Sequence, residues 1–288
     1  MKAWVFCLLV GVLFFGCVQP EGSSLKLKGS DTELQMFSAL AEEFVKANSG
    51  VSVTVTGGGS GTGIAALLNG EVDMADSSRP MTDEEVSKAR QRGVEPLEFV
   101  VARDGLAVVV HKSNGVSSLS LQQLADLYTG KITNWNQLGG EDREITLYGR
   151  QSTSGTYVYF RNVVLKADYS SSMRNMEGTA SIVDAVSSDK SGVGYVGLGY
   201  VTGAVSVVSL EGFSPLDKSV VETGEYPLTR PLYQYVNSNS QNKALLKLFL
   251  EFEVSKQGQE VVEGTGFLSI NSGDVSANNL AFEGLVLE

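Results

Sequence analysis

Apolar residues recur along the chain with two alternating periods. Residues 51–56 alternate valine with Ser, Thr and Thr, which is typical of a half-buried strand. Residues 33–47 have a helical period instead, and the apolar positions on one face are Leu34, Phe37, Leu40, Ala41, Phe44 and Val45. By the same reading the predicted strands are 25–30, 51–56, 71–78, 97–111, 144–150, 193–201 and 231–237. The predicted helices are 33–47, 64–70, 82–93, 120–130, 155–165, 181–192, 242–255 and 257–266.

This alternation of strands and helices predicts an α/β protein with mainly parallel sheet. Two of the helix starts have capping-box spacing, Thr82 with Glu85 and Ser120 with Gln123. The length of 288 residues suggests two domains, because a typical domain has about 150 residues. In such proteins ligands bind where loops leave the carboxyl ends of strands.

Four polar loops follow predicted strands: GSDT (29–32), GGGSGTG (57–63), DSSRP (76–80) and RQSTSGT (150–156). Glycine allows the backbone to approach a ligand, hydroxyls donate hydrogen bonds, and helix starts offer free N–H groups to an anion. Arg150 adds a planar, permanently charged fork that suits phosphate or sulfate oxygens. One such loop alone would usually be a helix cap, and Arg150 alone would usually be a surface ion-pair partner. Together the four loops predict an oxyanion site.

The N-terminal segment has the pattern of a secretory signal. Lys2 is followed by an uncharged apolar run to Gly16, which is short for a bilayer span, although an uncleaved anchor helix remains the alternative. The ending FFGC looks like a bacterial lipobox, with Phe14 where leucine is usual. We therefore expect residues 1–16 to be a signal peptide, Cys17 to be lipidated, and 17–24 to be a tether. The mature protein would then be extracytoplasmic and attached to the cell membrane, with no second cysteine for a disulfide.

Composition and motifs exclude several functions. A net charge of −11 argues against nucleic acid as a partner. The only histidine, His111, lies in an apolar strand run, so a Ser-His-Asp mechanism has no supporting spacing. Neither a lipase elbow around Ser60 nor a Walker A loop is present, and no cluster of metal ligands is evident. The dinucleotide fingerprint fits GTGIAA at 61–66, but Asp76 follows too closely, so we expect no cofactor and no metal.

Several motifs, in order, resemble those of the phosphate-binding proteins of Pst-type phosphate ABC transporters. The likeness runs from about residue 25 to about residue 268. The motifs are KGSDTE, TGGGSGTGIAAL, DMADSSRPM, GKITNWNQLGG, GRQSTSGTYVYF, GVGYVGLGYV and SKQGQEVVEGTGFL. The resemblance implies a two-lobe, type II periplasmic-binding-protein fold, each lobe a mixed, mainly parallel sheet with flanking helices. Two crossing strands would join lobe 1 (25–104 and 231–288) to lobe 2 (105–230).

The same resemblance implies a binding protein, not an enzyme, that captures inorganic phosphate and delivers it to an ABC permease as a monomer. The implied phosphate-binding residues are Ser30, Asp31, Thr32, Ser60, Ser78, Arg150, Ser154, Gly155 and Thr156. Ser78 departs from the family, because many members have an aspartate there that accepts the proton of phosphate and rejects sulfate. Asp31, Asp76 or the Ser78 hydroxyl would have to accept that proton here, and Arg79 is either a second cation or an ion-pair partner.

Three alternatives stay open at this point. The first is a binding protein for sulfate or another tetrahedral oxyanion. The second is a phosphate-ester hydrolase with Ser60 or Ser154 as nucleophile, although the sequence offers no plausible base. The third is a sensor or adhesin that has kept the fold.

Overall fold

The computed structural model describes residues 23–285, and within them the strands form a five-stranded and a six-stranded sheet. The first sheet contains β1 (Ser24–Gly29), β2 (Ser52–Thr56), β3 (Met74–Ser77), β4 (Pro96–Gly105) and β11 (Thr229–Asn237), in the spatial order β2-β1-β3-β11-β4. The second contains β5 (Ala107–His111), β6 (Ser118–Leu119), β7 (Thr146–Arg150), β8 (Arg174–Met176), β9 (Gly192–Val196) and β10 (Val205–Leu210), in the order β6-β10-β5-β9-β7-β8.

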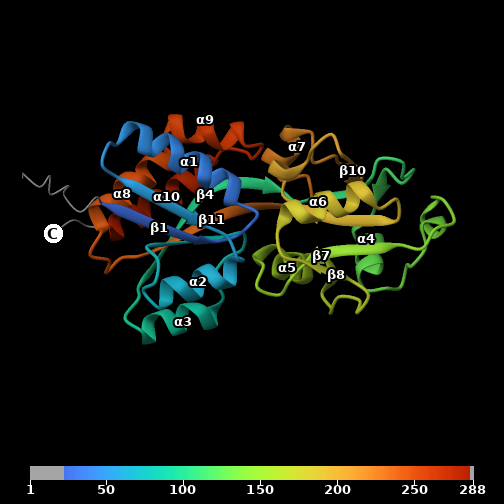
Figure 1. Cartoon of the computed structure of the whole chain (residues 1–288), viewed down its shortest axis with the longest axis horizontal. Coiled ribbons are helices and arrows are strands. Elements are labelled where there is room, and N and C mark those ends of the chain that lie inside the picture. Colours follow the sequence, from blue (N-terminus) through green and yellow to red (C-terminus); the bar gives the residue numbers. More distant parts are fainter. Residues whose placement is uncertain (1–22, 286–288) are drawn as a thin grey trace, which may run out of the picture.

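Helices cover both faces of the first sheet (Figure 1). The helices α1 (Leu34–Ala47), α8 (Lys243–Val254), α9 (Lys256–Gly264) and α10 (Ser272–Gly284) enclose one core, which includes Phe37, Phe44 and Phe249. The helices α2 (Ser60–Leu68) and α3 (Asp83–Gln91) enclose the other, around Ile64 and Leu67. On the apolar face predicted for residues 33–47, Phe37, Leu40, Ala41 and Phe44 are buried, whereas Leu34 and Val45 are half-buried.

The second sheet has one continuous core. The helix α6 (Thr179–Ser188) packs on β5, β7 and β9. The helices α4 (Leu121–Tyr128) and α5 (Gly155–Phe160) lie on the opposite face of this sheet (Figure 1). The short helix α7 (Lys218–Glu222) contacts β4 of the first sheet. Buried aromatic rings tie the core together, with the centroids of Phe160 and Tyr195 4.2 Å apart.

The chain passes between the sheets twice, at neighbouring strands. It leaves the first sheet through β4, enters β5 after Leu106, and returns along β11. β4 and β11 pair antiparallel from Thr229↔Gly105 to Asn237↔Pro96, so the two passages run side by side. The four antiparallel pairings between named strands all involve β11 or β5, and the others are parallel. These passages support the lobe boundaries at 104/105 and 230/231, which we retain as a prediction.

Some segments differ from their predicted form. The strand expected at 193–201 ends at Val196, and a 3₁₀ turn, Leu198–Tyr200, follows. The helix expected at 155–165 continues from α5 into a π turn, Arg161–Leu165, and ends where Lys166 adopts a positive φ of 50°. The capping boxes predicted at Thr82 and Ser120 are both present.

The N-terminal predictions fall almost wholly outside the described residues. The signal segment 1–16 and Cys17 lie there, and Ser24, assigned to the tether, is already the first residue of β1. Among residues 23–285, no helix combines the length and apolar character needed to cross a bilayer.

Candidate functional site

The four predicted loops meet at the carboxyl ends of β1, β2, β3 and β7. The Gly59 amide donates to the Gly29 carbonyl at 2.8 Å, and the Ser30 amide donates to the Asp76 carbonyl at 2.9 Å. These bonds join the three loops of the first sheet. The Gly61 amide donates to the Thr153 carbonyl at 3.0 Å, which connects them to the fourth loop, from the second sheet.

A cluster of buried hydroxyls occupies the junction. The Thr156 oxygen lies 2.8 Å from that of Thr32 and 3.2 Å from that of Ser78, and the Ser78 oxygen lies 3.4 Å from that of Ser60. All four residues are at most 2% exposed, although each can donate or accept a hydrogen bond. These neutral donors come from both sheets and form a set that can match the oxygens of one small anion.

Arg150 brings a buried positive charge to this cluster from the end of β7. Its side chain is 1% exposed, and one Nη donates to the Thr179 hydroxyl at 2.8 Å. The other Nη donates to the Glu177 carbonyl at 2.8 Å and pairs with the Asp31 carboxylate. The Arg150 Nε is buried and has no hydrogen-bond partner within residues 23–285. Since buried donors are nearly always satisfied, this unmatched N–H indicates that the site can take an additional acceptor.

Asp31 reaches Arg150 from the opposite sheet. Its carboxylate also accepts from the Gly58 amide at 3.0 Å, and its carbonyl accepts from the Tyr200 hydroxyl at 2.6 Å. The loop after β1 is therefore joined to the second sheet by both a charged and a neutral contact.

Glycine is required where the two sheets come closest. Gly59 has a φ of 94°, and a Cβ there would lie 2.6 Å from the Thr153 carbonyl oxygen. A Cβ on Gly155 would lie 2.3 Å from the Ser60 oxygen. Side chains at these positions would therefore force the loops apart.

A second guanidinium supports the cluster from β11. Arg230 is 2% exposed and holds Asp104 on β4 through two hydrogen bonds, of 3.1 Å from Nε and 2.9 Å from Nη2. It also donates to the Ser78 carbonyl at 3.1 Å and to the Thr156 hydroxyl at 3.2 Å. Arg230 thus connects the Thr156 hydroxyl and the Ser78 backbone to the strands that join the sheets.

The structure brings most of the predicted site residues together. Ser30, Asp31, Thr32, Ser60, Ser78, Arg150, Gly155 and Thr156 belong to the four converging loops, and their binding roles stay predictions. The Ser154 hydroxyl, in the same loop, accepts from the Tyr157 amide and so caps α5. Arg79 is an ion-pair partner, because it forms two hydrogen bonds with Glu85.

Thr179, Arg230 and Asp104 were not foreseen. A sequence signal existed for Arg230 and Asp104: each is a charged residue within a predicted strand. Neither reveals its partner, which is 126 residues away along the chain.

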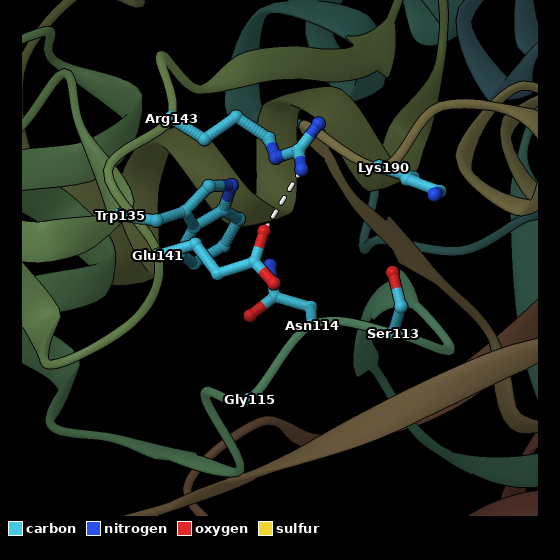
Figure 2. A pocket seen from close by; sticks show the side chains of 7 residues that line it. All are labelled: Ser113, Asn114, Gly115, Trp135, Glu141, Arg143 and Lys190. Carbon is cyan, nitrogen blue, oxygen red and sulfur yellow. Dashed lines mark hydrogen bonds and ion pairs between the residues drawn. The ribbon is translucent and has the colours of Figure 1, made fainter.

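Other places offer less chemistry. No group of metal-ligating side chains suited to an ion occurs in the described part of the chain. Figure 2 shows a separate cavity near Trp135 that holds about 10 Å³, room for about one water molecule. There Arg143 donates to Glu141 at 2.8 Å, and none of the predicted site residues lines this cavity.

Comparisons with known proteins agree with this geometry. A family profile described as "PBP superfamily domain" matches residues 18–257. The phosphate-binding protein PstS of Pseudomonas aeruginosa is 35% identical over 269 residues, which cover 86% of this chain and 83% of that protein.

Solved structures are similar as well. A phosphate ABC transporter substrate-binding protein from Clostridium perfringens, with bound phosphate, has a TM-score of 0.80 and 30% identity, over 86% of this chain and all of that one. An ABC-type phosphate transport receptor from Vibrio cholerae has a TM-score of 0.71 and 27% identity, over 85% of this chain and all of that one. The predicted two-lobe, type II periplasmic-binding-protein fold is thereby confirmed. The chain belongs to the PBP superfamily and, within it, to the family of PstS phosphate-binding proteins.

Proposed function

We propose that this chain captures inorganic phosphate between its two sheets and delivers it to the permease of an ABC transporter. The observation that carries the proposal is the buried Arg150, whose Nε lacks a partner among the described residues and which lies in a network of hydroxyls. Phosphate fits because its oxygens can accept from the guanidinium and from several hydroxyls at once. The names of the relatives in P. aeruginosa, C. perfringens and V. cholerae support the same substrate.

Binding without covalent chemistry is part of the proposal. Ser60 and Ser154 are the hydroxyls that a hydrolase would use, and the groups nearest to them are other hydroxyls and backbone amides. His111 lies at the far end of β5, where it bonds to Ser113. We also propose that the protein is a monomer, lipidated at Cys17 and held at the outer face of the cell membrane.

The Arg150→Ala variant tests the proposal by calorimetric titration with phosphate. We expect binding to fall by about a hundredfold or more, because hydrogen bonds to a charged group contribute about 1.5–3 kcal/mol each. Arg143→Ala is the matched control: it removes an arginine from the loop before β7, at the cavity of Figure 2, and should leave phosphate affinity unchanged. Equal affinities of both variants and the wild-type chain would contradict the proposed site.

Sulfate is the second candidate. Ser78 lies among the site hydroxyls, and unlike an aspartate at this position it has no carboxylate that would repel an anion without a proton. Titrations with phosphate, sulfate and arsenate at two pH values separate the two. Preference for phosphate supports the proposed substrate, and sulfate binding of equal strength contradicts it. Phosphatase activity that Ser60→Ala abolishes would indicate the hydrolase instead.

A further inference from the structure

Three carboxyl groups are buried together behind the loop that follows β1. Glu33 precedes α1 and is 0% exposed, Asp76 on β3 is 2% exposed, and Glu253 on α8 is 0% exposed. Gln234 on β11 is also fully buried and donates to the Asp76 carboxylate at 3.1 Å. We call these four residues the acid cluster.

Most polar atoms of the acid cluster are unsatisfied. Both carboxyl oxygens of Glu33, both of Glu253, and the amide oxygen of Gln234 are buried and lack hydrogen-bond partners in the part of the chain that is described. An ionised carboxylate in such a place is strongly disfavoured, whereas a protonated one carries its own donor. A proton on Glu253 would provide the donor that the Gln234 oxygen lacks.

The surrounding charges favour protons as well. Burial raises the pKa of Asp76 to about 7, and the Gln234 amide opposes this only in part. Burial also raises the pKa of Glu33, with Asp76 and Asp104 adding to the effect. Ser30 and Arg230 oppose it, although the Ser30 hydroxyl forms no hydrogen bond with the Glu33 carboxyl group and Arg230 is bound to Asp104. Burial again raises the pKa of Glu253, with Asp76 and Glu33 adding to it and nearby Gln234 opposing it.

A metal ion is a poor occupant for this place. The three carboxyl groups do not form a ligand set that could hold one, within residues 23–285. Protons are therefore the cations that can neutralise the carboxyl groups of Glu33 and Glu253, whose oxygens lack hydrogen-bond partners among the described residues.

The acid cluster and the anion site share their supports. The Asp76 carbonyl accepts from the Ser30 amide, and Asp76 lies two residues before Ser78 on the same strand and its exit loop. On β11, Arg230 and Gln234 belong to the alternating buried positions of one strand, and Arg230 bonds to Ser78 and Thr156. The acid cluster and the anion site are therefore joined through β3, β11 and the loop after β1.

We propose that Glu33, Asp76 and Glu253 form a proton-binding cluster whose proton occupancy rises when an anion binds in the adjacent loops. The inference rests on the proposed function, since phosphate is the anion. A negative charge arriving nearby disfavours ionised carboxylates, so a proton is taken up from solvent and one carboxylate becomes a neutral acid. Linkage is reciprocal: a protonated cluster favours anion binding, and an ionised cluster weakens it.

The size of the effect follows from Coulomb's law. At an effective dielectric constant of about 20, two unit charges about 10 Å apart interact strongly enough to shift a pKa by about one unit. One unit corresponds to about a tenfold change in affinity between the protonated and the ionised cluster.

The test is calorimetric titration with inorganic phosphate in buffers of low and high ionisation enthalpy, which counts the protons taken up per anion. Wild type, Asp76→Asn and Glu33→Gln are compared with Glu42→Gln, the matched control on the exposed face of α1, where the Glu42 side chain is 70% exposed. The ionisation of phosphate itself contributes equally to all four proteins and cancels in the comparison.

We expect wild type and Glu42→Gln to take up more protons per phosphate than Asp76→Asn and Glu33→Gln. The affinity of wild type relative to Asp76→Asn should fall about tenfold from about pH 6 to about pH 8, as the cluster ionises. Infrared difference spectra of the wild-type chain should gain a protonated-carboxyl band on phosphate addition, a readout that needs no variant to fold.

Equal proton uptake by all four proteins, or an unchanged carboxyl band in wild type, overturns the coupling and leaves the proposed function standing. A wild-type chain that binds no phosphate overturns both.

Discussion

Gly155 begins α5 and lies against the hydroxyls of Ser60 and Ser78, which come from the other sheet. A Cβ at this position would be 2.3 Å from the Ser60 oxygen and 2.8 Å from the Ser78 oxygen. Both distances are far below van der Waals contact, so a methyl group would separate the loops that surround the proposed anion.

We therefore predict that Gly155→Ala weakens phosphate binding about tenfold or more, since overpacking costs about 1–3 kcal/mol. Gly203→Ala is the control, because no atom lies within 4 Å of its added Cβ. Titration calorimetry measures the affinities, and equal values for the two variants would show that the loops do not close on the anion in this arrangement.

At the residue scale, the sequence predicted the site hydroxyls and Arg150 but not the hydrogen-bond partners of these groups. Loop composition is local, so the four loops could be predicted from glycine and hydroxyl content, whereas the choice of Ser60, Ser154 and Thr156 within them came from the family resemblance. Thr179 could not, because its role depends on Arg150 approaching from 29 residues away. Nor could the burial of Glu33 and Glu253, since each occurs in or beside an amphipathic helix where an acid is ordinarily exposed.

At the scale of elements, β4 and β11 are held together by more than their ladder. The Arg230–Asp104 pair is nearly fully buried, and Asp104 also accepts from the Leu198 amide at 2.9 Å. Removal of one partner would leave the other charge buried without compensation, which is more costly than the loss of an exposed ion pair.

We predict that Arg230→Met lowers the free energy of unfolding by about 3–5 kcal/mol, as expected for one broken buried pair. Arg103→Met is the comparison on the same strand as Asp104: its pair with Asp274 is more exposed, with 23% of the arginine accessible, so the loss should be smaller. Urea denaturation followed by circular dichroism gives both values. Losses of equal size in the two variants would mean that the buried Arg230–Asp104 pair contributes no more to stability than the more exposed Arg103–Asp274 pair.

Elements with a clear period were predicted well, and the failures have physical reasons. β10 has apolar residues on both sides of its sheet, so it lacks a clean alternation that distinguishes it from a buried loop. α10 buries only Asp274 and Asn278 along its length, so no apolar stripe marks it as a helix. The strand expected at 193–201 ends early, at Val196, and the next residue, Gly197, lies close to Thr32 and Asp104.

At the scale of the whole molecule, the buried acids make stability depend on pH. Asp76 has a pKa raised to about 7 in the folded chain, against an ordinary value of 3.8, and the pKa values of Glu33 and Glu253 are raised as well. The folded state therefore holds more protons than the unfolded state above about pH 4, and the stabilising effect of protonated Asp76 is lost as the pH rises from about 4 through about 7.

We predict that Asp76→Asn gains stability relative to wild type as the pH rises from about 4 to about 7, by about 1.4 kcal/mol for each pH unit. The amide cannot ionise, so it escapes the cost of a buried charge. Denaturant unfolding across this range, with Glu42→Gln as the exposed control, measures the difference. A constant difference between wild type and Asp76→Asn would mean that Asp76 titrates as an ordinary surface acid.

The first strand, β1, and the last helix, α10, lie in the same half of the molecule, the half that contains the first sheet (Figure 1). This placement limits how far that half can lie from an N-terminal membrane anchor. Both ends of the described chain belong to the half that contains the first sheet, so the backbone enters and leaves the second sheet only at neighbouring strands, β4 and β11. If Cys17 is fixed in the bilayer, the seven residues 17–23 allow β1 to lie at most about 25 Å from it. The first sheet would then stay within this distance of the membrane, and any change in the angle between the sheets would move the second sheet relative to it.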